Sequence, residues 1–130
     1  MRVFLDANIL FSASLPGSRT RRFLGTLFKS ATCVTNTYAI EEARRNLGEY
    51  HPKRIPALMK LVTRCEISRG LAPLPRNVLP SKDTPILAGA IAAASTHLLT
   101  GDERHFGKLW GTTISGVKIV SPRMLAAEIL

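Results

Sequence analysis

Short apolar runs and amphipathic stretches follow one another along the chain. The apolar run at residues 3–5 predicts a buried strand. Residues 20–30 carry apolar side chains at helical spacing, with basic side chains between them, which predicts a helix with a basic face. Because strands alternate with helices, we expect an α/β fold of parallel βαβ units. Further strands are predicted at 31–35, 63–67, 96–100 and 117–120, and further helices at 37–48, 52–62, 83–94, 103–109 and 123–130.

Capping residues mark several boundaries of these elements. Ser18 is placed to cap the first amphipathic helix, and Asn36 or Thr37 can cap the helix that follows the second strand. Gly48 fits the end of that helix, since glycine is favoured after a last helical turn. Irregular connections are expected at 12–18, which contains a Pro-Gly pair, and at 70–80, which is rich in proline.

Length and composition indicate one globular domain over residues 1–130, of which 45% are hydrophobic. No apolar run approaches the roughly 18 to 20 residues that span a bilayer. The start of the chain lacks the pattern of a signal peptide, so a cytoplasmic location is expected. Cys33 and Cys65 have no metal-site spacing, and we expect them to be reduced thiols of the core.

The charge balance changes the picture, because 18 Lys and Arg stand against 9 Asp and Glu, a net charge of +9. Such an excess favours a polyanionic partner, and Arg, the more frequent cation, suits forked contacts to phosphate. Aromatic residues are few and are not interleaved with the cations. We therefore expect contact with a phosphate backbone rather than with a stacking platform for bases.

Acidic residues fall at places that a parallel sheet would bring together. Asp6 follows the first strand, Asp102 follows the strand at 96–100, and Asp83 begins a helix. Glu41 and Glu42 lie in the first turns of the helix after the second strand. Strand ends and the starts of the following helices share one edge of such a sheet. Clustered carboxylates need a hard divalent cation such as Mg²⁺ or Mn²⁺, which indicates metal-assisted hydrolysis of phosphodiester bonds.

Each of these acids also has a simpler explanation. Asp83 is suited to cap its helix, Asp102 to a turn beside Gly101, and Glu41 or Glu42 to a solvated helix face. Asp6 is harder to explain in this way, since a charge directly after a buried strand needs a partner.

Neighbouring polar residues are candidates for supporting roles. Asn8 can brace the loop after Asp6 or touch a ligand, and Thr100 can offer its hydroxyl to the site. His105 lies three residues past Asp102 without a second histidine, which favours a structural or surface role over that of a general base. No role is assigned to the other two histidines, His51 and His97.

Four stretches of the chain resemble the successive motifs of the PIN-domain ribonucleases. They are Val-Phe-Leu-Asp-Ala-Asn at 3–8, Ala-Ile-Glu-Glu-Ala-Arg-Arg-Asn-Leu at 39–47, Asp-Thr-Pro-Ile-Leu-Ala-Gly-Ala at 83–90 and Leu-Leu-Thr-Gly-Asp at 98–102. The resemblance spans nearly the whole chain and is greatest to the toxin-antitoxin, VapC-like branch. It implies a three-layer α/β/α sandwich with a central parallel sheet, and a single-strand endoribonuclease that depends on Mg²⁺ or Mn²⁺.

The resemblance also implies roles for particular residues and partners. Asp6, Glu42, Asp83 and Asp102 match the acidic quartet that binds the metal and catalyses. Glu42 is preferred to Glu41 because relatives place the acid directly before an apolar residue, although geometry alone leaves both open. The family further implies an RNA substrate, a cognate antitoxin that inserts a basic side chain into the acid cluster, and homodimers in many members.

Two other classes of protein compete with this interpretation. An aspartyl-phosphate phosphatase also begins with a strand that ends in Asp, but it needs a second Asp where this chain has Asn8. A non-catalytic RNA-binding or regulatory module would keep the fold without turnover. Such a module has no need of four clustered acids, so the nuclease is the preferred hypothesis.

Overall fold

A mixed sheet flanked by helices forms the centre of the computed structural model, which describes residues 1–74 and 83–130. The described residues form six strands in the order β3-β2-β1-β4-β6-β5. The strands are β1 (Arg2–Leu5), β2 (Thr32–Asn36), β3 (Glu66–Ser68), β4 (His97–Leu99), β5 (Thr113–Ile114) and β6 (Val117–Val120). Five of them run parallel, and β5 alone is antiparallel to its neighbour β6. The predicted α/β class with a mostly parallel sheet is confirmed.

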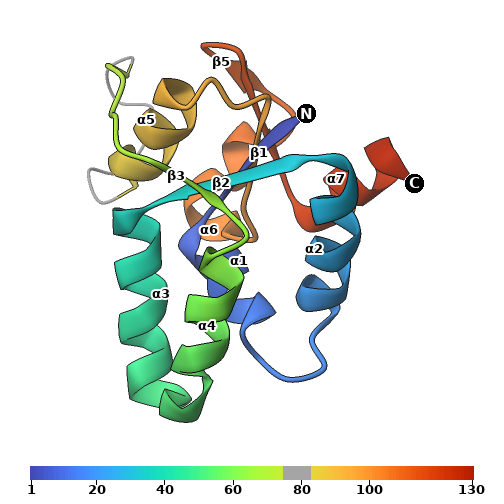
Figure 1. Ribbon diagram of the computed structural model, residues 1–130. Coiled ribbons are helices and arrows are strands. Elements are labelled where there is room, and N and C mark those ends of the chain that lie inside the picture. The colour runs from blue at the N-terminus through green and yellow to red at the C-terminus, as the bar shows by residue number, and fades with distance from the viewer. Residues whose placement is uncertain (75–82) are drawn as a thin grey trace.

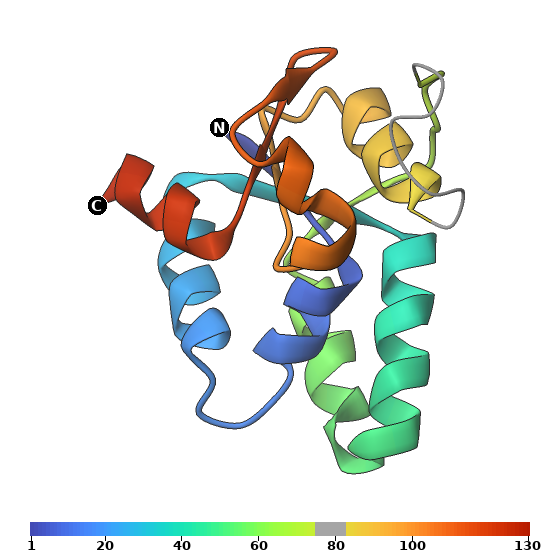
Figure 2. The same ribbon diagram turned by 180° about the vertical axis from the view of Figure 1, so that it is seen from behind.

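Helices cover both sides of this sheet (Figure 1). α1 packs against α2, α3 and α4 on one side, whereas α5 contacts β2, β3 and β4 from the other side, as Figure 2 also shows. The α-helices are α1 (Ala7–Ala13), α2 (Arg19–Ser30), α3 (Thr37–Tyr50), α4 (Ile55–Val62), α5 (Thr84–Ala92), α6 (Glu103–Phe106) and α7 (Pro122–Ile129). Two 3₁₀ turns, η1 (Pro52–Arg54) and η2 (Gly107–Leu109), complete the described elements.

The central strand β1 explains the apolar run at the start of the chain. Val3, Phe4 and Leu5 are fully buried, because β1 pairs with β2 on one edge and with β4 on the other. A parallel strand covered on both faces needs apolar side chains at successive positions. The chain leaves this strand at Asp6, which therefore lies at the carboxyl end of the sheet.

Helix starts agree with the capping residues that the sequence offers. The Ser18 hydroxyl accepts a hydrogen bond from the backbone N–H of Arg21, and the Asn36 side chain accepts one from Ala39. Asn36 is thus the N-cap of α3, which decides between the two candidates at that position.

Two predicted boundaries are wrong. The loop that was expected to begin at residue 12 begins only after residue 13, because α1 runs from Ala7 to Ala13 and buries Ile9 and Leu10. Gly48 is not a C-cap, since α3 continues to Tyr50. The helix ends at Tyr50, and its C-cap residue His51 leaves the α-helical region, which is disfavoured for a residue before proline.

The strands β3 and β5 also differ from the sequence-based prediction. The strand expected at 63–67 is shifted to Glu66–Ser68. β5 was not predicted; it forms a hairpin with β6 through Ser115 and Gly116, both with positive φ, as a two-residue turn requires. Of the connection expected at 70–80, residues 75–80 lie outside the described part of the chain.

Two further expectations concern membranes and cysteines. Within the described residues, none of the helices has the length and apolar character needed to cross a bilayer. Cys33 and Cys65 are both free, the first buried and the second half-buried. Burial raises the pKa of the Cys33 thiol to about 12 and that of the Cys65 thiol to about 11, so both stay protonated at neutral pH.

Candidate active site

Acidic side chains from four separate segments line one pocket of about 440 Å³ at the carboxyl end of the sheet. Asp6 follows β1, Glu42 lies in the second turn of α3, Asp83 precedes α5, and Asp102 lies between β4 and α6. The four acids of the predicted quartet are therefore brought together by the fold. This is the edge where open α/β sheets bind ligands.

Asp6 is the most enclosed of the four acids, with 4% of its surface exposed. Its Oδ1 accepts a 2.6 Å hydrogen bond from the N–H of Ala7, and its Oδ2 accepts one of 2.8 Å from the Thr100 hydroxyl. Burial, together with the nearby charges of Glu42 and Asp102, outweighs these hydrogen bonds and raises the pKa of Asp6 to about 6. A cation in the pocket would favour the ionised form.

Asn8 and Thr100 join the two loops that carry Asp6 and Asp102. Asn8 Nδ2 donates to Asp6 Oδ2 over 3.2 Å, while its Oδ1 accepts the N–H of Gly101 over 2.8 Å. The Thr100 hydroxyl donates to Asp6 and accepts the N–H of Asp102 over 3.1 Å. Asn8 thus braces the two loops, and it also lines the pocket, so both roles expected for it agree with its position.

His105 lies between two of the acids. Its Nδ1 is 2.8 Å from Asp102 Oδ2 and 3.2 Å from Asp83 Oδ2. Asp83 occupies the N-cap position of α5 but makes no capping hydrogen bond, so the simple capping explanation does not hold. These contacts agree with the structural role that was one of the two roles expected for His105. The spacing of three residues on one helical turn could have predicted the contact of His105 with Asp102, but the contact with Asp83 is not visible in the sequence.

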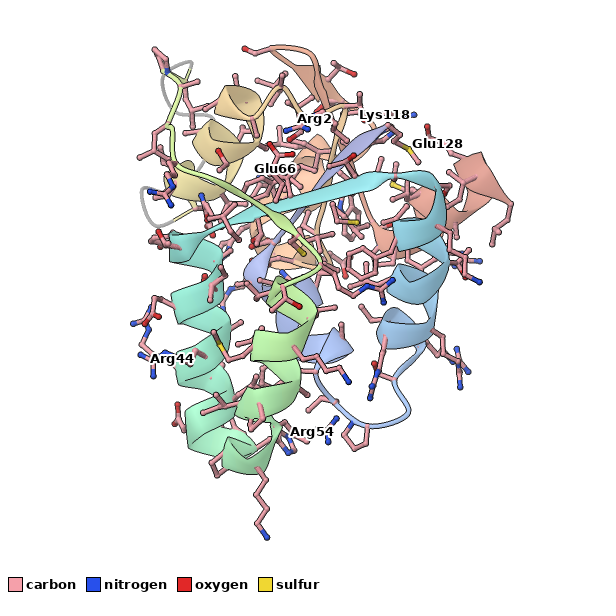
Figure 3. The ribbon with its side chains drawn as sticks, in the orientation of Figure 1. Arg2, Arg44, Arg54, Glu66, Lys118 and Glu128 are labelled. Carbon is pink, nitrogen blue, oxygen red and sulfur yellow. The ribbon has the colours of Figure 1, made fainter. Side chains whose placement is uncertain are left out.

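The two adjacent glutamates of α3 face different surroundings. Glu41 is exposed and pairs over 2.7 Å with Arg44, which points away from the body of the molecule in Figure 3. Glu42 is half-buried and lines the pocket. Successive residues of a helix point about 100° apart, which separates these neighbours where the sequence left both open.

The donor set of this pocket fits a divalent cation. Asp83, Asp102 and His105 each offer one ligand atom, and these atoms lie within 4.8 Å of one another. Asp6 and Glu42 add carboxylates to the same pocket. Carboxylate oxygens outnumber the single imidazole, and such oxygen-rich sites suit hard cations.

A second pocket, which we call the basic groove, lies between α2 and α4. Its cationic side chains are Arg21, Arg54, Lys60 and Arg64, and no acidic residue is found among the described residues that line it. Arg54 donates to the backbone oxygen of Ser14 over 2.7 Å, next to the end of α1 (Figure 3). Part of the positive charge of the chain is thus concentrated near the helix that also lines the acidic pocket.

Comparison with known proteins shows which solved structures share this fold. No protein-family model and no curated protein sequence matches the chain. Among solved structures, VapBC2 from Rickettsia felis, bound to a DNA fragment from their promoter, aligns over 93% of this chain and 98% of its own with a TM-score of 0.63. The chain has the VapC fold.

Two further structures agree with the VapC fold. The FitAcB structure from Neisseria gonorrhoeae aligns over 93% of this chain and 98% of its own, with 14% identity and a TM-score of 0.55. VapC20 from Mycobacterium tuberculosis, a sarcin-ricin loop cleaving toxin, aligns over 78% and 91%, with 11% identity and a TM-score of 0.52. Identity to VapBC2 is 16%, so the likeness is one of fold. The predicted PIN-like architecture is confirmed.

Proposed function

We propose that the chain is a metal-dependent endoribonuclease of the VapC type, which hydrolyses phosphodiester bonds in single-stranded RNA. The observation that carries this proposal is the convergence of Asp6, Glu42, Asp83 and Asp102, from four separate segments, on one pocket together with His105. The VapC fold and the net charge of +9 support it.

Asp83, Asp102 and His105 would hold Mg²⁺ or Mn²⁺, with Asp6 and Glu42 completing the charge of the site. When bound, the cation would supply Lewis-acid stabilisation of the phosphate and lower the pKa of the attacking water. Glu42, which lines the pocket from α3, would accept a hydrogen bond from the attacking water and orient it. Thr100 and Asn8 fix Asp6 through their hydrogen bonds, and the cations of the basic groove position the RNA backbone.

A matched pair of variants tests this function, because Glu41 and Glu42 are adjacent on α3 but differ in placement. With Mn²⁺ or Mg²⁺, the parent is expected to cleave a single-stranded RNA oligonucleotide, and a chelator is expected to stop it. Glu42→Gln should cleave about 10²-fold more slowly or worse, and Glu41→Gln at the parent rate. Equal loss in both variants, or an inactive parent with either metal, would contradict the proposal and favour a non-catalytic module.

We further propose that the chain is the toxin of a toxin-antitoxin pair, since an unrestrained ribonuclease would damage its own cell. Related folds have been crystallised as VapBC2 and FitAB, each bound to DNA. The antitoxin would place a basic side chain among the acids of the pocket, where it offsets their charge. Expression of the parent should stop bacterial growth, Asp6→Asn should not, and co-expression of the neighbouring gene product should restore growth. Growth arrest by both proteins would contradict this role.

A further inference from the structure

The active-site pocket has a second end, which the four acids do not occupy. Phe11, Asn46 and Tyr50 line it, together with the acids. Glu42, Asn46 and Tyr50 follow one another at intervals of four residues and therefore share one face of α3. Since a helix rises 1.5 Å per residue, Tyr50 lies about 12 Å along the axis from Glu42. The pocket thus changes from carboxylates at one end to aromatic and amide side chains at the other.

The aromatic side chains of this end are available to a ligand. Tyr50 is 66% exposed and, among the described residues, is the one aromatic side chain in the set of exposed large hydrophobic residues. Phe11 is half-buried, and its ring lies 6.1 Å from that of His51, in a tilted arrangement. An aromatic side chain exposed beside a concave site offers a large apolar face and, for Tyr50, a hydroxyl group to a ligand.

The two parts of a nucleotide match the two ends of this pocket. Its anionic phosphate is attracted to a cation held by the acids, and its base is an aromatic ring with hydrogen-bonding edges. Bases of single-stranded RNA are recognised by stacking on aromatic side chains and by amide hydrogen bonds to their edges. The volume of about 440 Å³ lies within the range of roughly 300–1,000 Å³ of small-ligand sites.

We propose that Phe11, Asn46 and Tyr50 form a subsite for one base next to the scissile phosphate. The Tyr50 ring stacks on the base, the Phe11 ring packs against its other side, and the Asn46 amide hydrogen-bonds its edge. This inference rests on the proposed nuclease function. The low aromatic content of the chain argued against an extended platform on which many bases stack. A subsite for a single base needs only two aromatic residues, so it is consistent with that content.

Nucleotide binding can be tested without any cleavage. The 5′-monophosphates of the four ribonucleosides would be titrated into the parent with Mg²⁺, and ring proton shifts of Tyr50 followed by NMR, with Tyr50→Phe for assignment. Tyr38, the other tyrosine, lines a different pocket but lies within electrostatic reach of Glu42 and Asp83, so its shifts report cation or phosphate binding without stacking. Upfield shifts of Tyr50 with a nucleotide but not with ribose 5-phosphate are expected. Equal shifts with ribose 5-phosphate, or no shift of Tyr50 with any nucleotide, would overturn the subsite.

Kinetics separate the subsite from the catalytic centre. Tyr50→Ala should raise KM for a short oligonucleotide about tenfold, with Mn²⁺ affinity unchanged, and Tyr50→Phe should restore it. Asn46→Ala should broaden the preference for the base beside the cut. Met59→Ala removes an exposed apolar side chain of α4 that is not in the pocket and serves as the control. Parent kinetics in Tyr50→Ala would refute the subsite while leaving the nuclease intact, whereas an inactive parent would refute the nuclease and leave the NMR result to decide on base binding.

Discussion

Burial and hydrogen bonding act on the pKa of Asp6 in opposite directions. Burial raises it from 3.8 to about 6, although Thr100 and Ala7 donate hydrogen bonds to the ionised carboxylate. The folded chain therefore binds this proton more tightly than the unfolded chain does. A raised pKa contributes stability below about pH 4, and this contribution is lost as the pH rises through 6. The most enclosed acid of the pocket thus lowers stability at neutral pH.

The first prediction follows from the upward shift of the pKa of Asp6. In the presence of a chelator, Asp6→Asn should gain stability relative to the parent, by up to about 3 kcal/mol, as the pH rises from about 4 to 7. The free energy of unfolding, measured by urea denaturation of both proteins across this range, checks it. A difference that does not change with pH would contradict the raised pKa. Because the variant stays folded, its loss of RNA cleavage would report on chemistry.

Two buried threonines on either side of β1, Thr35 on β2 and Thr100 just after β4, give the second prediction. The Thr100 hydroxyl contacts Asp6 and the N–H of Asp102, whereas the Thr35 hydroxyl donates only to the backbone oxygen of Leu5, over 3.0 Å. Replacement of either by Val should cost about 1–3 kcal/mol in the free energy of unfolding. Only Thr100→Val should also weaken Mn²⁺ binding and RNA cleavage. Equal effects on activity would show that Thr100 does not position the acids.

Single site residues could be predicted from the sequence where their immediate neighbours in the chain indicate their position. A charge directly after an apolar strand identified Asp6, and position after a strand identified Asp102. Glu42 could not be separated from Glu41, because this requires knowing which face of α3 is covered. The contact of His105 with Asp83 could not be predicted, because it joins two segments that are far apart in the chain.

Close packing between α5 and the start of α3 gives a prediction at the scale of elements. A Cβ on Gly89 would lie 2.5 Å from Asn36 Nδ2 and 3.3 Å from Phe4. Asn36 cannot move freely, since its amide caps α3 and donates to Pro85 on α5 over 3.1 Å. Gly89→Ala should therefore lower the free energy of unfolding by about 1–3 kcal/mol.

Gly25 on α2 is the control for that substitution, because a Cβ there would meet nothing within 4 Å. Gly25→Ala should be neutral or should stabilise the fold by up to about 1 kcal/mol, through helix propensity. Thermal and urea denaturation of both variants check the pair. A destabilised Gly25→Ala together with an unaffected Gly89→Ala would contradict the described packing.

The basic groove between α2 and α4 gives a second prediction at this scale. Lys60→Gln should weaken binding of single-stranded RNA to a similar degree for all sequences, and should reduce the slope of log affinity against log salt by about 0.7. Lys118→Gln is the control, since Lys118 lies 3.5 Å from Glu128, at the opposite end of the molecule from Arg54 (Figure 3). Fluorescence anisotropy at several salt concentrations measures both slopes. Identical slopes in the two variants would remove the groove from the RNA path.

Helix starts were predictable and helix ends less so. Ser18 and Asn36 have the side-chain oxygens that cap a helix, and the structure uses both. Gly48 was misread because Pro52, rather than a glycine, determines where α3 ends. α1 was missed in part because Asp6, its N-cap, was read for its position after a strand. The two-residue strand β5 is too short for any periodicity.

On the scale of the whole molecule, charge is divided between two regions. The chain carries a net charge of +9, yet four of its nine acids line a single pocket. Composition alone indicated a polyanionic partner, and the topology of the parallel sheet explains why the acids converge. The alternating pattern made the α/β class predictable, whereas the aromatic end of the pocket depends on how α1 packs on α3. An acidic pocket in a basic protein is best explained by a resident cation.

The location of that cation is the most direct test of the central claim. A crystal soaked in Mn²⁺ should show an anomalous scattering peak within ligand distance of Asp83 and Asp102, and a crystal of Asp102→Asn should lose it. Glu103→Gln, an exposed acid beside Asp102, should keep the peak. A saturated soak with no peak in the pocket, or with peaks only at other sites, would contradict the assignment of these acids to a metal-dependent nuclease.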